Sequence, residues 1–449
     1  MKKFFIFALT SALALSLFGC SSEQTPTEET DSSAVKGTYS VNIGGYDWGA
    51  EVNKVTLTLD SPIGNIDKDT FVVSETKMAT DFSQAPEFPI EEVTNEKTVL
   101  DAYLVDEDGN KVSEDSKYVV IELDPNPTDG SIFVFSLHTM LNAYSDVHYL
   151  DISLSETADV KVNGSDKLEA IEIETAYTSK TTDADKFELG NYVASDGIEY
   201  NYAYYVPEVE SNVLVVWLHG MGEGGVEDTD PYLTSLANKV TSLISDDFQN
   251  TIGNAHVLVP QSPTYWMDND GKQTNFEGGS IVADGTSYYT ESLAELIDKY
   301  KEDNNIDKVV LTGCSNGGYM TMVLAMTYPE KYDAVVPICE AVADDTITDE
   351  QIASLVDLPM YFIYAETDPT VVPEKHEIPT IERLKEAGAK NLNVATTESV
   401  VDLSGNYKDE DGEPFEYNGH WSWIYFFNNE SVENTTGLTP WNFIKENVK

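Results

Sequence analysis

A strand that runs into a glycine-flanked serine is the feature of this sequence that most constrains its fold. The apolar run 309–311 leads into the pattern G-x-S-x-G over residues 313–317, and apolar residues at helical spacing follow it. A strand, a sharp turn and a helix are the context in which this pattern carries a nucleophilic serine. The two glycines remove side chains that would collide as the chain reverses. We therefore predict that Ser315 is a nucleophile; the alternative is a glycine-rich turn without chemistry.

The second half of the chain, residues 185–449, is predicted to be an α/β domain with a mainly parallel sheet. Continuous apolar runs, typical of strands buried on both faces, alternate with helical patterns. These runs cover residues 213–218, 257–260, 309–311, 334–339 and 360–364. An antiparallel hairpin around Asp196-Gly197 precedes them, and a weaker strand at 391–395 and a helix from Pro440 follow.

The first half, residues 38–180, is predicted to be a β-sandwich. Apolar and polar residues alternate with period two, and turn-forming clusters separate the short strands. No nucleophile, base or ligand set is clustered here, and His138 and His148 are expected to be structural. We expect this domain to have a positioning or assembly role; carbohydrate binding is the alternative.

The N-terminus is predicted to be an export signal over residues 1–20. Two lysines precede an apolar run that is too short for a membrane-spanning helix, and the run ends in Leu-Phe-Gly-Cys. This ending resembles a bacterial lipobox, in which Cys20 is lipidated and becomes the first mature residue. Phe18 is bulkier than the residue usual there, so ordinary cleavage stays open. Residues 21–37 are a polar linker, and the expected location is the outer face of the bacterial cell membrane, lipid-anchored, or the secreted fraction.

The charge balance restricts the partners. The 449 residues include 26 Lys and Arg against 79 Asp and Glu, a formal net charge of −53. So acidic a surface repels nucleic acid and anionic lipid headgroups, so membrane contact is expected only through the N-terminal lipid. Cys314 and Cys339 lie in apolar runs and are expected to be buried free thiols, although a disulfide between them stays open. Whether the chain forms a homo-oligomer is also open.

Three motifs in this order resemble a known family. They are His219-Gly220 with the glycines that follow (residues 219–225, hereafter the glycine loop), the turn at 313–317, and Asn418-Gly419-His420 with two tryptophans after it. From about residue 187 to the end, the chain is similar to the α/β-hydrolases, among them secreted esterases related to polyhydroxybutyrate depolymerases and feruloyl esterases. The segment Tyr46-Asp47-Trp48-Gly49 resembles the N-terminal immunoglobulin-like domain of a group of two-domain bacterial esterases.

A serine nucleophile needs a base, and the base needs an acid to hold its tautomer. His420 lies in a glycine-flanked loop after the last strand, where the chain order Ser, Asp, His requires the base. Asp368 follows the apolar run 360–364 and matches the acid loop of the family, although the His-Gly that often opens that loop is Tyr-Ala here. Glu366 and Glu340 are the alternative acids.

The three other histidines of the second half are expected to be structural. His219 is expected to position backbone at the start of the glycine loop. His256 opens a buried strand, and His376 lies among charged residues that are typical of a solvated surface.

The oxyanion of an acyl-transfer intermediate needs two donors already aimed at it. The backbone N–H of Asn316 is the first predicted donor, and that of Met221 in the glycine loop is the second. Four aromatic residues are expected either to line the acyl or leaving-group pocket or to pack in the core or rim: Tyr265, Trp266, Trp421 and Trp423. No metal or cofactor is expected, because no cluster has metal-ligand spacing and no dinucleotide fingerprint occurs.

These features imply a secreted, lipid-anchored serine carboxylesterase that acts through an acyl-enzyme. The alternatives are a peptidase or amidase of the same fold and a surface binding module with a vestigial hydrolase domain. The substrate stays open among a short acyl ester, a feruloyl or acetyl sugar ester, and a polyester.

Overall fold

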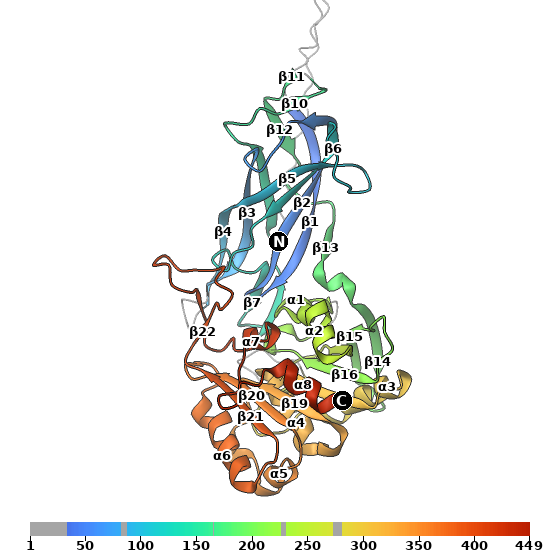
Figure 1. The fold of residues 1–449 in the computed structure, drawn as a ribbon, viewed down its shortest axis with the longest axis vertical. Coiled ribbons are helices and arrows are strands. Elements are labelled where there is room, and N and C mark those ends of the chain that lie inside the picture. The colour runs from blue at the N-terminus through green and yellow to red at the C-terminus, as the bar shows by residue number, and fades with distance from the viewer. Residues whose placement is uncertain (1–33, 82–87, 165, 226–229, 273–280) are drawn as a thin grey trace, which may run out of the picture.

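The computed structural model describes residues 34–81, 88–164, 166–225, 230–272 and 281–449. They form two domains, one above the other in Figure 1. The predicted export signal, its Cys20 and most of the predicted linker lie outside the described residues. Within the described ranges, no helix combines the length and hydropathy that crossing a membrane requires.

The first domain is a β-sandwich, as predicted. Its larger sheet contains β1 (Ala34–Tyr46), β2 (Gly49–Gly64), β5 (Val99–Val105), β6 (Ser116–Leu123), β10 (Lys161–Val162), β11 (Asp166–Lys167), β12 (Ala170–Ile173) and β13 (Lys180–Thr182). The smaller sheet contains β3 (Phe71–Thr80), β4 (Ile90–Lys97) and β9 (His148–Leu154), and a separate hairpin contains β7 (Phe133–Ser136) and β8 (Leu141–Tyr144). Alternate residues of β2 (Val55, Leu57 and Leu59) are buried between the sheets, which explains the period-two pattern.

The boundaries of this domain differ slightly from the prediction. The sandwich begins at Ala34 rather than at residue 38, because Ala34–Gly37 pairs in parallel with Ala170–Ile173. It extends to Thr182 rather than residue 180, because β13 pairs with β1. The sequence did not reveal this pairing, because β1 lies between β2 and β12 in the sheet and β12 comes much later in the chain.

The second domain contains a mainly parallel sheet of the α/β-hydrolase type, as predicted. In spatial order its strands are β14 (Glu188–Val193), β15 (Glu199–Tyr205), β17 (His256–Pro260), β16 (Val213–Leu218), β18 (Lys308–Cys314), β19 (Ala334–Ile338), β20 (Met360–Ala365) and β21 (Leu392–Thr397). The pairs β14–β15 and β15–β17 are antiparallel, and the other neighbours are parallel. A small ribbon, β22 (Val400–Val401) and β23 (Glu416–Tyr417), lies outside this sheet.

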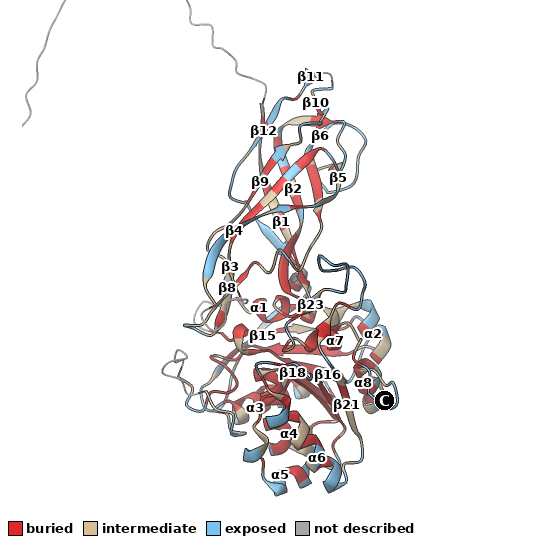
Figure 2. Ribbon diagram, turned by 90° about the vertical axis from the view of Figure 1, so that its left-hand side faces the viewer, coloured by how far each residue is buried: buried red, intermediate tan, exposed pale blue. Residues whose placement is uncertain are grey.

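Helices cover both faces of the sheet (Figure 2). They are α1 (Leu233–Leu236), α2 (Asp246–Ile252), α3 (Thr290–Asp303), α4 (Asn316–Thr327), α5 (Asp349–Ser354), α6 (Glu377–Ala387), α7 (Trp423–Phe427) and α8 (Pro440–Val448). Leu214 and Val216 of β16 pack in the core that α3, α4, α5 and α6 complete. Val215 and Trp217, which point the other way, pack in the core that α2, α7 and α8 complete. Burial on both faces accounts for the uninterrupted apolar runs.

The two domains share packed side chains. Trp48, in the turn between β1 and β2, belongs to a hydrolase-domain core and meets Tyr407 edge-on, with ring centroids 4.9 Å apart. Asp47 accepts hydrogen bonds from Lys239 Nζ (3.2 Å) and Asn428 Nδ2 (3.1 Å). In return, α1 contributes leucines to the sandwich core. The segment Tyr46-Asp47-Trp48-Gly49, which the sequence analysis noted only for its resemblance to a known domain, therefore forms part of the contact between the two domains.

A buried charge cluster crosses the sandwich, which the sequence analysis missed. Lys97 forms an ion pair with Glu51, and Lys77 forms one with Glu75 at 3.1 Å, with all four side chains fully buried. His148 Nε2 lies 2.8 Å from Glu75 Oε1, so this histidine is a satisfied structural residue. Burial raises the pKa of Glu51 to about 7. Burial also acts to raise the pKa of Glu75, but the hydrogen bond from His148 and the charge of Lys77 outweigh it and lower that pKa to about 2.

Candidate active site

Ser315 occupies a strained position between β18 and α4. Its φ of 53° and ψ of −117° lie outside the regions that residues with side chains normally adopt. Such a conformation costs about 1–3 kcal/mol and persists only where the surroundings impose it. Here the Ser315 N–H donates to Ile338 O at 2.9 Å, which ties the turn to the neighbouring strand β19. The strand, sharp turn and helix that the sequence predicted around Ser315 are therefore present, and this is the geometry of a nucleophile elbow.

The two glycines of the elbow are required by close backbone approaches. A Cβ at Gly313 would lie 2.5 Å from the carbonyl oxygen of Gly317. A Cβ at Gly317 would lie 1.8 Å from the carbonyl oxygen of Leu218, at the end of β16. Both distances are shorter than any van der Waals contact, so a side chain at either position would displace the start of α4.

His420 lies between Ser315 and Asp368 in one hydrogen-bonded row. His420 Nε2 is 2.9 Å from Ser315 Oγ, and Nδ1 is 2.7 Å from Asp368 Oδ2. An ionised carboxylate only accepts hydrogen bonds, so Nδ1 carries the proton and Nε2 is left to accept the serine hydroxyl. The structure thus brings together the three residues that chain order selected.

Backbone contacts of the surrounding loops hold Asp368 and His420 in place. The other oxygen of Asp368, Oδ1, accepts the backbone N–H groups of Thr370 (2.8 Å) and Val371 (2.9 Å). The Asp368 side chain is fully buried, whereas that of His420 is 11% exposed, so only the imidazole reaches the surface. A Cβ at Gly419 would lie 2.7 Å from Thr367 O, which shows how closely the histidine loop rests on the acid loop.

The two alternative acids lie elsewhere. Glu366 is exposed. Glu340 is fully buried, and its Oε2 accepts the N–H of Val342 at 2.8 Å. Its electrostatic neighbour is the equally buried Glu377, and burial raises the pKa of both carboxyls. The carboxylate bonded to the imidazole is therefore that of Asp368.

His219 fixes the beginning of the glycine loop. Its Nδ1–H donates to Gly220 O at 2.6 Å, and its Nε2 accepts the N–H of Ser262 at 2.9 Å. Complete burial lowers the pKa of His219 to about 4, so the ring is neutral at pH 7 and suits one donor and one acceptor role. This is the backbone-positioning function expected from the sequence.

The two predicted oxyanion donors both lie at the start of a helical turn. Asn316 is the first residue of α4, and Met221 is the first residue of the short 3₁₀ helix η2 (Met221–Glu223). Backbone N–H groups at such positions have no acceptor within their own helix and remain available. The side chain of Asn316 is buried, and its Oδ1 accepts the N–H of Met267 at 2.9 Å.

The four aromatic residues divide into two pairs. Tyr265 and Trp266 are fully buried, and the Trp266 ring lies 5.1 Å from that of His219, where it supports the glycine loop. The Trp423 ring meets the His420 ring edge-on at 5.5 Å, and the half-buried Trp421 lies 6.3 Å from Trp423. The second pair is therefore adjacent to the imidazole.

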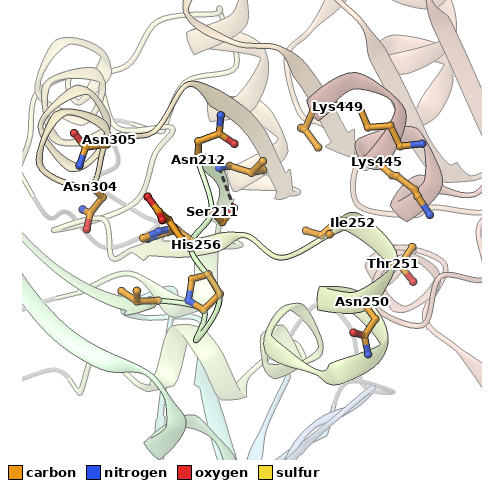
Figure 3. Close-up of a pocket in the computed structure, with 16 residues that line it drawn as sticks. Ser211, Asn212, Asn250, Thr251, Ile252, His256, Asn304, Asn305, Lys445 and Lys449 are labelled. Carbon is orange, nitrogen blue, oxygen red and sulfur yellow. Dashed lines mark hydrogen bonds between the residues drawn. The ribbon is translucent and has the colours of Figure 1, made fainter.

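The remaining histidines lie away from Ser315. His376 was expected on a solvated surface but is half-buried, because it contacts the segment that follows β19, where its Nδ1 donates to Val342 O at 3.0 Å. His256 begins β17 and lines a pocket of about 760 Å³ (Figure 3). This pocket lies at the amino ends of the parallel strands, whereas Ser315 follows the carboxyl end of β18, so the pocket is separate from the candidate site.

Cys314 and Cys339 are buried and not joined by a disulfide. Among the described residues, one group of potential metal ligands occurs: a ligand atom of Cys339, one of Asp368 and one of His420 lie within 4.8 Å of one another. Both nitrogens of His420 already face hydrogen-bond partners. Burial raises the pKa of the Cys339 thiol well above its usual value, so the thiol stays protonated. These contacts are typical of hydrogen-bonded Asp368 and His420 beside a buried thiol rather than of a metal site.

A serine at a nucleophile elbow, joined through histidine to aspartate on a mainly parallel sheet, defines a serine hydrolase of the α/β-hydrolase fold. Comparison with protein families agrees with this class. Residues 203–402 match the phospholipase/carboxylesterase family, and residues 38–165 match the esterase Ig-like N-terminal domain. The protein is a two-domain esterase, with an Ig-like domain before an α/β-hydrolase domain of the phospholipase/carboxylesterase type.

The chain is similar to two other proteins, one over a short stretch of sequence and one over most of the structure. A stretch of 96 residues is 34% identical to poly(3-hydroxyalkanoate) depolymerase C of Paucimonas lemoignei, covering 20% of this chain and 22% of that relative. The chain thus matches less than a quarter of the length of this relative. The crystal structure of a thermostable esterase superposes with a TM-score of 0.62 and 22% identity over 87% of this chain and 96% of that chain. This second likeness establishes that the two-domain fold is shared.

Proposed function

We propose that the protein is a serine carboxylesterase that cleaves its substrate through an acyl-enzyme on Ser315. The observation that carries the proposal is the row Ser315 Oγ, His420 and Asp368, with separations of 2.9 and 2.7 Å. At this distance, an imidazole nitrogen can take the proton of the hydroxyl while the hydroxyl oxygen attacks a carbonyl carbon. The match to the phospholipase/carboxylesterase family supports an ester as the substrate.

The proposed reaction has two halves. His420 Nε2 takes the Ser315 proton as Oγ adds to the ester carbonyl, and the N–H groups of Asn316 and Met221 hold the negative charge on the carbonyl oxygen. When the intermediate collapses, His420 gives this proton to the departing alcohol. Water then attacks the acyl-enzyme with His420 again as the base, which releases the acid and restores the serine. Asp368 keeps the imidazole in one tautomer and stabilises its charged form.

Short acyl esters and related glycan or polyester esters are the proposed substrates. The local similarity to a protein named poly(3-hydroxyalkanoate) depolymerase supports testing polyesters. We also propose that Cys20 anchors the exported protein by a lipid to the outer face of the cell membrane. The support for this is the lysine-led apolar run ending at Cys20 and the polar stretch after it.

A substrate panel tests the activity. The full-length protein is labelled with a fluorophosphonate, and its hydrolysis of an acyl-chain series of esters, feruloylated and acetylated glycans, poly(3-hydroxyalkanoate) and peptides is measured. We expect labelling at Ser315 and hydrolysis of esters in preference to peptides. Faster cleavage of peptides would show an amidase, and the absence of both labelling and hydrolysis would show a vestigial domain.

A further inference from the structure

The Ig-like domain packs directly against the glycine loop. Its hairpin β7–β8 places Asn142 so close to Gly222 that a Cβ on this glycine would lie 2.3 Å from Asn142 Nδ2. A Cβ on Gly224 would lie 3.2 Å from Leu141 Cδ2 of the same hairpin. Side chains of the hairpin therefore pack directly against the backbone of the glycine loop, and the glycines make this approach possible.

Asn142 also forms a hydrogen bond with a buried carboxylate of the loop. Its Nδ2 donates to Glu223 Oε1 at 3.1 Å, although 81 residues separate the two in the sequence. Glu223 is the last residue of η2 and is only 5% exposed. The proposed reaction gives Glu223 no chemical step, so its burial beside the loop needs another explanation.

The carboxyl of Glu223 packs against the turn that contains Met221. A Cβ on Gly220 would lie 3.0 Å from Glu223 Oε2, so the carboxyl and the residue before Met221 are in contact. Glu223 Oε2 has no hydrogen-bond partner among the described residues. Asn142 makes the largest of the hydrogen-bonding contributions that favour the charged carboxyl, and the backbone of Gly220 and Glu223 and the side chain of Asn238 make smaller ones.

The ionisation of Glu223 is finely balanced. Burial raises its pKa to about 7, and the hydrogen bond from Asn142 is the largest effect that opposes this rise. The titratable groups that face Glu223 supply no positive charge at neutral pH. His219 Nδ1 lies 4.0 Å away, but its depressed pKa keeps the ring neutral, and burial together with the charge of Glu223 raises the pKa of the Cys314 thiol.

We infer that Asn142 is a positioning residue of the hydrolase site, which acts from the other domain: it holds Glu223, and through Glu223 it holds the glycine loop that presents Met221. This inference rests on the proposed esterase function. Donors to an oxyanion stabilise it only when they are already in place. A small displacement of the loop therefore reduces the stabilisation of the transition state more than it reduces the affinity for the substrate.

The main test replaces the Asn142 amide with a carboxylate, which has the same shape but cannot donate a hydrogen bond. In the full-length protein, Asn142→Asp removes the donor and places a second carboxylate against Glu223, whereas Asn142→Ala removes the donor alone. We expect kcat to fall by about tenfold or more in Asn142→Asp and less in Asn142→Ala, with KM little changed. The acid limb of the kcat profile should move to higher pH, because Glu223 without its donor ionises less readily.

The double variant Asn142→Asp, Glu223→Gln restores one hydrogen bond with its direction reversed, and it should recover most of kcat. Asn42→Ala is the matched control, since the Asn42 amide also donates to a side chain, Thr181 Oγ1 at 2.9 Å, but within its own domain. We expect its kcat and pH profile to match the wild type.

A kcat of Asn142→Asp within about twofold of the wild type, with an unmoved acid limb, would overturn the inference. An equal loss in Asn42→Ala would do the same, because it would show general destabilisation of the domain. If Asn142→Asp does not fold by circular dichroism, Asn142→Ala decides by the same criterion. Failure of the proposed function is distinguishable, because then the wild-type protein itself would neither react with a fluorophosphonate nor hydrolyse esters.

Discussion

Trp48 of the Ig-like domain and Tyr407 of the hydrolase domain meet edge-on, with ring centroids 4.9 Å apart and planes at 83°. The indole N–H of Trp48 also donates to the buried Glu51 Oε2 at 2.8 Å. One side chain therefore links the buried charge cluster of the first domain to the apolar core of the second. Separation of the domains would expose this ring and remove the partner of Tyr407, so we expect the two domains to unfold together.

Replacement of Trp48 by alanine tests this coupling. Loss of a buried tryptophan costs about 3–5 kcal/mol, and we expect the free energy of unfolding in urea to fall by that amount. Tyr407→Ala should cost less, and the double variant should reveal a coupling of about 0.5–1.5 kcal/mol from the ring pair. Two separate urea transitions in the wild-type protein would contradict the shared core.

Replacement of Ser315 by alanine is expected to abolish ester hydrolysis and fluorophosphonate labelling. Stability should not fall, because the hydroxyl contributes little to packing and the strained backbone is unchanged. Ester turnover and thermal unfolding, measured on the same preparation, separate the two effects. Activity within about tenfold of the wild type would exclude Ser315 as the nucleophile.

Replacement of Asp368 by asparagine is expected to lower kcat on the order of 10⁴-fold, because the amide favours the wrong imidazole tautomer. Substrate binding should change far less. Glu366→Gln is the exposed control and should leave kcat near the wild-type value. Glu340→Gln tests the buried alternative: a crippled Glu340 variant beside a nearly normal Asp368 variant would move the acid to Glu340.

Glu340 and Glu377 make stability depend on pH in a predictable direction. Burial raises both pKa values above the ordinary 4.5, so their stabilising contribution is complete below about pH 4.5 and is lost as pH rises through the raised values. We expect Tm to fall as pH rises from about 4.5 towards about 8, the raised pKa of Glu340, and to fall less in Glu340→Gln. Below about pH 6.5 the depressed pKa of His219 acts in the opposite direction, so the difference in Tm between the wild type and Glu340→Gln, rather than the wild-type Tm alone, measures the contribution of the carboxyls.

Replacement of Cys20 by serine tests the proposed anchor. Full-length protein made in its host should partition into the detergent phase, and the Cys20→Ser protein should stay in the aqueous phase. The measurement is a detergent phase separation followed by immunoblotting. Equal partitioning of the two proteins would show that Cys20 carries no lipid.

The features that could be predicted from the sequence are those that local geometry determines. The elbow around Ser315 was predictable because only glycine fits two residues on either side of it. The continuous strands were predictable because both of their faces are buried. That Ser315 and Asp368 lie close together was predictable because they follow β18 and β20, and parallel strands bring their carboxyl ends to one edge of the sheet. His420 was predictable from its place after both in the chain order Ser, Asp, His.

Contacts between distant polar residues could not be predicted. Asn142 and Glu223 are unremarkable polar residues in a chain with 79 acidic ones, and no spacing relates an amide on one hairpin to a carboxylate in another domain. The role of Trp48 was hidden for the same reason, because its partner Tyr407 comes much later in the sequence. The strand at Ala34 was missed because its stability comes from pairing with β12 rather than from its own composition.

The contact of hairpin β7–β8 with the glycine loop has a consequence for biosynthesis. The hairpin precedes the loop in the chain, and N-terminal domains generally fold first during translation. The glycine loop, whose small residues give it little conformational preference of its own, is therefore synthesised after the hairpin against which it packs. A circular permutation that moved the Ig-like domain to the C-terminus would reverse this order, so the loop would be synthesised before the hairpin that supports it.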